Sequence, residues 1–187
     1  MALPCNENAL AWVDRFPDWP YTALIIYGEK GCGKTHLLNV WRAKAGRYHL
    51  IIDNADDMFG DRDKEIELFH RFNQSKEDQN YLAISITSLQ NLDKILLPDL
   101  KSRLKAAPMV KILPPDDMDV QAILVKLFHD RQLKIEPGVI AYILPRIERS
   151  YSVIHDLVQK IDENSLSEKR SVTVPLVRDI LQEPQLI

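Results

Sequence analysis

The amino-acid sequence predicts an α/β domain followed by a small all-helical domain. Short apolar runs alternate with helically spaced apolar stripes as far as residue 113, which is typical of a mainly parallel sheet flanked by helices. A glycine-rich segment stands between one of these runs and the stripe that follows it, and after Pro114 and Pro115 every periodic segment has helical spacing. We therefore expect an α/β domain at 1–113 and a helical domain at 114–187.

In the first domain, apolar runs predict buried strands and the stripes between them predict helices. The strands are expected at 22–27, 48–52, 81–88 and 109–113. The helices are expected around 9–13 with Asn6 or Asn8 as the cap, from Lys34 to Gly46, across 66–73, and around 100–104. The segment from Pro17 to Pro20 stops the first helix, because proline lacks the N–H group that a helix needs.

In the second domain, four amphipathic stripes predict four helices. Apolar residues from Val120 to Phe128 recur at i, i+3, i+4, i+7 and i+8, and a second stripe covers 140–147 with a kink at Pro145. A third stripe covers 153–161, and the last helix begins near Thr173, whose side chain suits the cap.

Composition excludes several functional classes. The chain has 187 residues, 24 Lys and Arg against 27 Asp and Glu, and a net charge of −3, which argues against a protein that works mainly by coating phosphates. The longest apolar run, 139–144, is far shorter than the roughly 20 residues that span a bilayer, and no apolar signal segment follows Met1. With only Cys5 and Cys32, a disulfide framework is excluded, so we expect a cytoplasmic protein that does not enter a membrane.

The segment from Gly28 to Thr35 matches the phosphate-binding pattern GxxxxGK[ST] in full. It follows a predicted buried strand and precedes a predicted helix, which is the setting that phosphate binding by this motif requires. Glycines let backbone N–H groups point at phosphate oxygens, and the helix N-terminus adds partial positive charge. Lys34 is expected to reach the β- and γ-phosphates, and the Thr35 hydroxyl to bind Mg²⁺.

A second acid at the end of an apolar strand completes such a site. Asp53 follows Leu50, Ile51 and Ile52, so we expect it to hold Mg²⁺ through water. The next residue is Asn54, at the position where hydrolysing members of one large class of P-loop proteins have a carboxylate that activates water. Because an amide cannot take a proton at neutral pH, this site is predicted to bind nucleotide better than it cleaves it. Asp56 or Asp57 could substitute as a base, although a solvated acidic loop is the favoured interpretation.

The other chemistry-bearing residues form weaker patterns. The five histidines lack metal-ligand spacing, and Cys32 is interpreted as a spacer in the loop rather than a redox thiol. A short basic stretch lies near the end of the α/β domain and consists of Lys101, Arg103, Lys105 and Lys111. Few aromatic residues stand between these cations, so the stretch does not predict a groove that binds nucleic acid.

These motifs resemble those of the AAA+ proteins of the DnaA/Hda type, bacterial replication initiators and their regulators. The resemblance covers nearly the whole chain and is carried by GEKGCGKTHLL at 28–38, IIDN at 51–54, ITS at 86–88 and LPDLKSRL at 97–104. The pair Asp53-Asn54 is similar to Hda rather than to DnaA, which usually has two acids there. The LPDLKSRL segment and Arg149-Ser150 are most similar to Hda homologues of alphaproteobacteria, and no DNA-binding domain is expected after the helical domain.

The resemblance implies a P-loop AAA+ base, a helical lid, and a regulator that prompts DnaA to hydrolyse its ATP. Arg103 would be the arginine finger, acting in trans, and the sensor candidates are Thr87, Ser88 and Arg149. The cofactors would be ATP or ADP with Mg²⁺, the partners DnaA, the DNA sliding clamp and a second copy of the chain, and no sequence-specific DNA binding is expected. The nucleotide-binding residues would be Gly28, Glu29, Lys30, Gly31, Cys32, Gly33, Lys34, Thr35 and His36.

Three other interpretations stay open at this point. The chain could be an active AAA+ ATPase of the helicase-loader or DnaA-like type, a small P-loop kinase, or an interaction module that has lost its nucleotide. The spacing between the motifs is also unusual for the family. Only 19 positions separate Lys34 from Asp53, which leaves no room for the strand and helix that the family normally places there.

Overall fold

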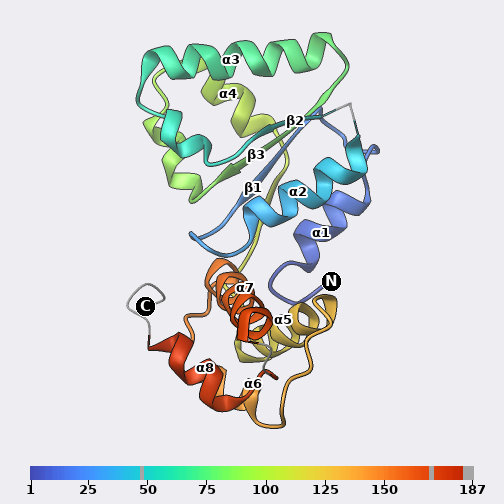
Figure 1. Ribbon diagram of the computed structural model, residues 1–187. Coiled ribbons are helices and arrows are strands. Elements are labelled where there is room, and N and C mark those ends of the chain that lie inside the picture. The colour runs from blue at the N-terminus through green and yellow to red at the C-terminus, as the bar shows by residue number, and fades with distance from the viewer. Residues whose placement is uncertain (47–48, 169–170, 183–187) are drawn as a thin grey trace. The chain divides into compact units, whose positions relative to one another are not determined.

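The computed structural model describes residues 1–46, 49–168 and 171–182 of the 187-residue chain (Figure 1). The chain divides into two compact units, Met1–Leu113 and Pro114–Ile187. The first unit contains the sheet, and the described elements of the second unit are helices, apart from an isolated parallel bridge between Ile135 and Val172.

The sheet of the first unit has four parallel strands in the order β2-β3-β1-β4. The strands are β1 (Ala23–Tyr27), β2 (His49–Ile52), β3 (Tyr81–Ile86) and β4 (Met109–Lys111). The predicted parallel sheet is therefore confirmed, although β3 and β4 each end two residues earlier than expected. Tyr48, the predicted start of the second strand, lies outside the described residues.

Helices cover both faces of this sheet (Figure 1). Helices α1 (Glu7–Asp14) and α2 (Lys34–Ala45) pack on one face, where Leu24 and Ile26 of β1 point. Helices α3 (Arg62–Glu77) and α4 (Pro98–Ala106) pack on the other face, against Ile25 of the same strand. Successive side chains of a strand point to opposite faces, so one apolar run serves both cores.

The connection between α2 and β2 is short, as the spacing of the two motifs implies. Helix α2 ends at Ala45 and β2 begins at His49, so β2 follows it directly and lies at the edge of the sheet. The structure also contains two short 3-10 helices that the sequence reading missed, η1 (Ala55–Met58) and η2 (Leu89–Lys94). Each follows the carboxyl end of a strand, and together they carry polar residues to that edge.

The second unit has four helices within its described residues: α5 (Asp117–Asp130), α6 (Val139–Ile143), α7 (Tyr151–Glu168) and α8 (Val174–Leu181). Asp116 and Asp119 cap α5 reciprocally, and Thr173 caps α8 as predicted. The predicted helix over 140–147 is wrong in length. It ends at Ile143: Leu144 still has helical backbone angles, but Pro145 has no N–H group with which to continue the helical hydrogen bonds.

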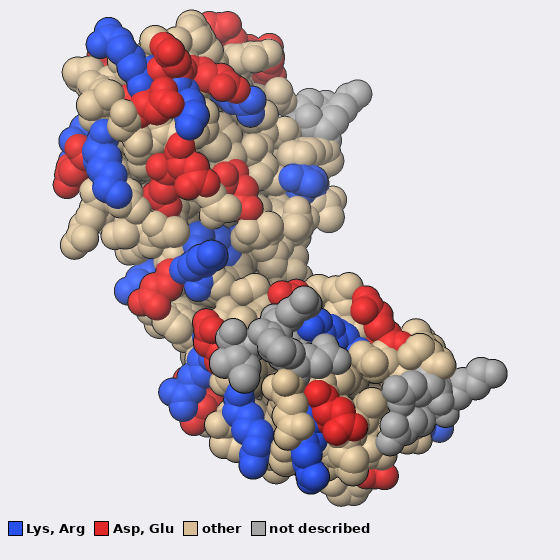
Figure 2. Space-filling view, turned by 60° about the vertical axis from the view of Figure 1, so that its left-hand side comes forward, with Lys and Arg blue, Asp and Glu red and all other residues tan. Residues whose placement is uncertain are grey.

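Charge is mixed over the surface. On the face drawn in Figure 2, acidic and basic side chains are interspersed over each unit, which agrees with the small net charge of −3. Of the helices that the structure describes, none combines the length and the apolar character that crossing a bilayer requires.

Candidate nucleotide-binding site

The P-loop joins the end of β1 to the start of α2, and two of its glycines are required by geometry. A Cβ on Gly28 would lie 2.4 Å from the carbonyl oxygen of Ile112, so no larger residue fits there without backbone movement. Gly33 occupies the N-cap of α2 with a left-handed φ of 105°. No side chain caps this helix from the N-cap position, and the start of a helix is a favourable place for an anion.

Lys34, the predicted phosphate-binding lysine, is buried inside the P-loop. Only 5% of the residue is exposed, and its Nζ donates hydrogen bonds to the carbonyl oxygens of Gly28 at 2.8 Å and Glu29 at 2.9 Å. These neutral acceptors orient the ammonium but do not cancel its charge. One of its three N–H donors remains for a phosphate oxygen.

Thr35 and Asp53 meet at the carboxyl end of the sheet. The Thr35 hydroxyl donates to Asp53 Oδ2 at 2.7 Å, so the structure brings together the two predicted Mg²⁺-site residues from α2 and from the end of β2. Ser85 of β3 donates to Asp53 Oδ1, and its own oxygen accepts the N–H of Asn54 at 2.8 Å. The Asp53 carboxylate is therefore held from two sides.

Ser85 is a site residue that sequence reasoning missed. It is fully buried in β3, where the run Tyr81–Ile86 is otherwise apolar or aromatic. A single hydroxyl inside such a run is the signal that could have found it, since a buried hydroxyl requires a hydrogen-bond partner.

The donor set around Asp53 fits Mg²⁺ in part. The Thr35 hydroxyl and the Asp53 carboxylate are oxygen ligands, the kind that Mg²⁺ prefers. Across 1–46, 49–168 and 171–182, no three His, Cys, Asp or Glu side chains gather closely enough to hold a metal ion. Magnesium usually keeps several waters and takes phosphate oxygens as further ligands, so a site with few protein ligands suits it.

A second polar network holds Thr87 just after β3. The backbone N–H of Thr87 donates to Asp56 Oδ2, and the Asn91 amide donates to Asp56 Oδ1 at 3.1 Å and to Thr87 Oγ1 at 2.9 Å. Asp56 is therefore a structural acceptor here rather than a solvated loop residue. Ser88, the other sensor candidate of this segment, caps η2 by accepting the N–H of Gln90 at 3.3 Å.

The remaining residues of the loop differ in exposure. Glu29, Lys30 and His36 are exposed, whereas Cys32 is buried. Burial raises the pKa of the Cys32 thiol above its ordinary value of 9.0, although nearby Lys34 acts in the opposite direction. A thiol that stays protonated is a poor nucleophile, in agreement with the predicted spacer role.

The two predicted arginines have different surroundings. Arg103 is on α4, which packs on the opposite face of the sheet from α2, and its Nη1 donates to Asn73 Oδ1 of α3. Arg149 belongs to the second unit, where it forms an exposed ion pair with Asp117 at 2.9 Å. The contacts of Arg103 are therefore neutral, and those of Arg149 include a carboxylate.

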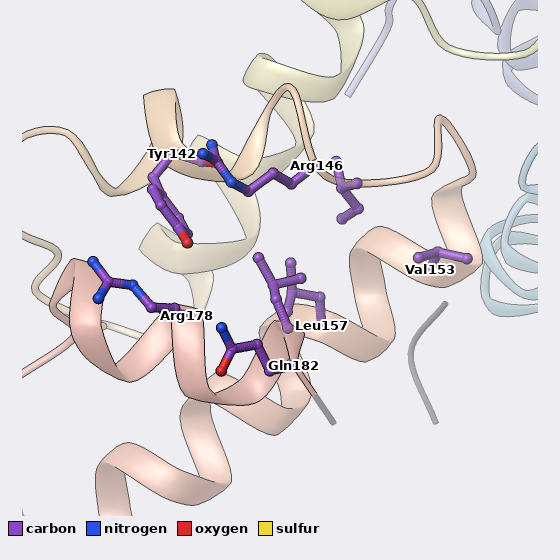
Figure 3. A pocket seen from close by; sticks show the side chains of 8 residues that line it. Tyr142, Arg146, Val153, Leu157, Arg178 and Gln182 are labelled. Atoms are coloured by element: carbon purple, nitrogen blue, oxygen red, sulfur yellow. The ribbon is translucent and has the colours of Figure 1, made fainter. Parts of the chain in front are cut away.

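The second unit has a pocket of its own, with an accessible volume of about 330 Å³ (Figure 3). Leu157 is fully buried at this pocket, and the Arg146 guanidinium lies 4.0 Å from the centre of the Tyr142 ring. None of the residues predicted for nucleotide binding lines it. Its lining consists of Tyr142, Arg146, Ile147, Val153, Leu157, Arg178, Leu181 and Gln182.

Comparison with known proteins gives matches to both units. Residues 117–181 match the family described as the lid domain of Hda. The chain is 25% identical to the chromosomal replication initiator protein DnaA of Thermomicrobium roseum, over 95% of this chain and 46% of that initiator, so it spans less than half of that relative. The alignment covers 216 positions, more than the chain contains, so the relative carries insertions.

Solved structures show the same fold. Domain III of the Thermotoga maritima DnaA superposes with a TM-score of 0.78 at 20% identity, covering 99% of this chain and 94% of that one. AMPPCP-bound DnaA from Aquifex aeolicus gives a TM-score of 0.71 at 20% identity, covering 90% of this chain and 67% of that one.

A P-loop between β1 and α2, an acid at the end of β2 and a helical second unit are the features of an AAA+ nucleotide-binding module. The match to the Hda lid family and the alignment with the DnaA initiator indicate which AAA+ proteins the chain resembles. Residues 117–181 match the Hda lid, and the chain as a whole is similar to AAA+ proteins of the DnaA/Hda type.

Proposed function

We propose that the chain binds ATP or ADP with Mg²⁺ at the P-loop, from Gly28 to His36. The contact between Thr35 and Asp53, beside a buried and charged Lys34, carries this proposal. Two DnaA structures similar to this chain are described as bound to AMPPCP, which supports it further. Thr35 would bind Mg²⁺ directly, Asp53 would hold it through water, and the metal would neutralise charge on the phosphates.

Replacing Lys34 tests the nucleotide site. Lys34→Ala removes one charge-assisted contact to phosphate, worth about 1.5 to 3 kcal/mol, or roughly tenfold to a hundredfold in affinity. Titration with a fluorescent ATP analogue measures it, and Lys44→Ala is the matched control, because Lys44 lies on the same helix but pairs with Asp14. Equal affinity of the Lys34→Ala variant and the parent would exclude this site.

We further propose that the protein regulates replication initiation by promoting ATP hydrolysis on DnaA, in the cytoplasm and together with the sliding clamp. The lid match to Hda supports a regulator, and Asn54 supports slow hydrolysis in the protein's own site. Arg103 would be the arginine finger that acts on the ATP bound to DnaA. A guanidinium aimed at the γ-phosphate stabilises charge in the transition state, which is worth on the order of 10³ to 10⁵ in rate.

Other proposed roles follow from the same family. Thr87, Ser88 and Arg149 remain sensor candidates, with Thr87 favoured by its network at the end of β3 and Arg149 weakened by its pairing with Asp117. A second copy of the chain is a further proposed partner. Specific duplex binding is not proposed, since charges are mixed on the drawn surface and the net charge is −3.

The regulatory proposal is tested by following labelled ATP on purified DnaA with clamp-loaded DNA. We expect the parent to accelerate hydrolysis, and we expect Lys34→Ala to need more nucleotide in solution for the same effect, because the proposed regulator works with nucleotide bound. Without DnaA, the parent should turn over well below the roughly 1 to 100 s⁻¹ of efficient phosphoryl-transfer enzymes. Fast turnover alone, with no effect on DnaA, would favour the motor ATPase instead.

A further inference from the structure

Helix α4 carries three cations, and they are held in different ways. Lys101 and Lys105 both form ion pairs with Asp93 at 3.2 Å. Hydrogen bonds from Lys101 and then Lys105 hold the pKa of Asp93 below its ordinary value. Among the described residues, no carboxylate lies within ion-pair distance of Arg103. The charge of Arg103 is therefore not compensated by a neighbouring acid.

Arg103 is nevertheless fixed in place, by neutral groups of α3. Its Nη1 donates to the amide oxygen of Asn73, and its guanidinium carbon lies 4.7 Å from the centre of the Phe69 ring. Phe72 lies farther away, at 5.8 Å. Phe69 and Asn73 are four residues apart, so they share one face of the helix. An aromatic face and an amide oxygen both attract a cation without neutralising it.

Hydrogen bonds also connect α3 to the start of α4. Glu65, one helical turn before Phe69, is fully buried, and its carboxylate accepts the N–H groups of Leu96 and Leu97 at 2.9 to 3.0 Å. Leu97 is the N-cap of α4. A side chain held on fixed helices keeps its direction, and fixed donors reorganise little when a reaction develops charge.

We propose that Phe69 and Asn73 are positioning residues for Arg103. The Phe69 ring fixes the plane of the guanidinium, and the Asn73 amide oxygen fixes the direction of one of its NH₂ groups. The charge and the remaining N–H donors stay free for an anion on another molecule. This inference rests on the proposed function, in which that anion is the γ-phosphate of ATP on DnaA. Neutral partners are essential to it, because a carboxylate at position 73 would pair with Arg103 and compete with the phosphate.

The test exchanges the neutral partner for a charged one. Asn73→Asp should lower the maximal rate of ATP hydrolysis on DnaA at least tenfold, towards the level of Arg103→Ala, with an unchanged melting temperature. Gln74→Glu is the matched control, because it adds the same charge to the adjacent, exposed position and should leave the rate near that of the parent. Phe69→Leu should lower the maximal rate severalfold, and Phe69→Tyr should restore it by keeping the ring.

The outcomes separate this inference from the function on which it rests. A parent that stimulates DnaA, with Asn73→Asp and Phe69→Leu equally active, overturns the positioning role alone. A parent without any effect on DnaA overturns the proposed function and this role with it. The NMR signal of the Arg103 Nε–H group in the isolated protein gives a second readout. It should be shifted by the Phe69 ring and lose that shift in Phe69→Leu, and an unshifted signal in the parent would overturn the role independently of DnaA.

Discussion

The P-loop edge of the sheet and the α3–α4 face both present a cation, but they hold it differently. Lys34 is buried within its own loop, next to the Asp53 carboxylate network that completes the site. Arg103 is half-buried on the opposite face of the sheet, with an aromatic ring and an amide as its partners. The first arrangement contains acid, hydroxyl and cation together, whereas the second contains only the cation and neutral groups that direct it.

This difference indicates two kinds of function. A site that gathers a lysine, a helix N-terminus, a hydroxyl and an acid has the groups that the proposed nucleotide and its metal require. A lone oriented guanidinium cannot hold a ligand of that size, but it can complete the site of another molecule. The proposed regulator would therefore use one face for its own nucleotide and the other for the nucleotide of its partner.

The largest expected effect on stability comes from removing the Glu65 carboxylate, which connects α3 to α4. Glu65→Ala would remove the buried acceptor of three backbone N–H groups, those of Gly60, Leu96 and Leu97. We expect a loss of about 3 to 5 kcal/mol in the free energy of unfolding, or roughly 10 °C in melting temperature. Thermal denaturation measures this loss. Glu67→Ala is the control, because Glu67 is an exposed partner of Arg71, and it should cost about 0.5 kcal/mol or less.

The next effect concerns the P-loop edge. Gly28→Ala would place a Cβ 2.4 Å from a backbone oxygen, so the loop must move. We expect a loss of about 1 to 3 kcal/mol in stability and a more than tenfold loss in nucleotide affinity, because the moved loop no longer matches the phosphates. Gly46→Ala has no heavy atom within 4 Å and should cost stability only, through its left-handed φ of 62°. Unchanged nucleotide binding by Gly28→Ala would contradict the site.

A smaller effect is expected at Ser85. Ser85→Ala frees the Asn54 N–H group and one oxygen of Asp53, which should cost about 1 to 2 kcal/mol. If Asp53 serves Mg²⁺, nucleotide affinity should also depend less on magnesium concentration. Ser75→Ala removes another buried hydroxyl, bonded to the Asn80 carbonyl, and should lower stability without that second change. Calorimetry at several magnesium concentrations distinguishes the two variants.

The smallest effect is expected at Asn54. Asn54→Asp restores a carboxylate and should raise the basal ATPase rate by roughly tenfold or less, below the 10² to 10⁴ of a fully aligned base. The backbone there is left-handed, with φ 52° and ψ 49°, a conformation that Asp tolerates as Asn does. Steady-state phosphate release measures the rate, with Asp57→Asn as the control at a nearby exposed acid. An unchanged rate would show that the missing acid does not limit hydrolysis.

Local patterns predicted the parts of the site that lie together in the sequence. The P-loop, its flanking strand and helix, and Asp53 at a strand end follow from spacing and periodicity, and so does the parallel sheet. Ser85, Glu65 and Asn73 did not emerge, because their partners lie about thirty residues away: Ser85 is 32 residues from Asp53, Glu65 is 31 from Leu96, and Asn73 is 30 from Arg103. Only the packing of strands and helices brings such pairs together.

The most direct test of the two-face account measures two properties of one Arg103→Ala preparation. The account predicts an ATP affinity of the variant itself within about twofold of the parent, since Arg103 does not contact the P-loop, and a loss of stimulated hydrolysis on DnaA of at least a hundredfold. Arg103→Lys should recover little of that loss, because an ammonium lacks the planar, two-pronged donor geometry. Undiminished stimulation by Arg103→Ala, or a parallel fall in its own nucleotide affinity, would contradict the account.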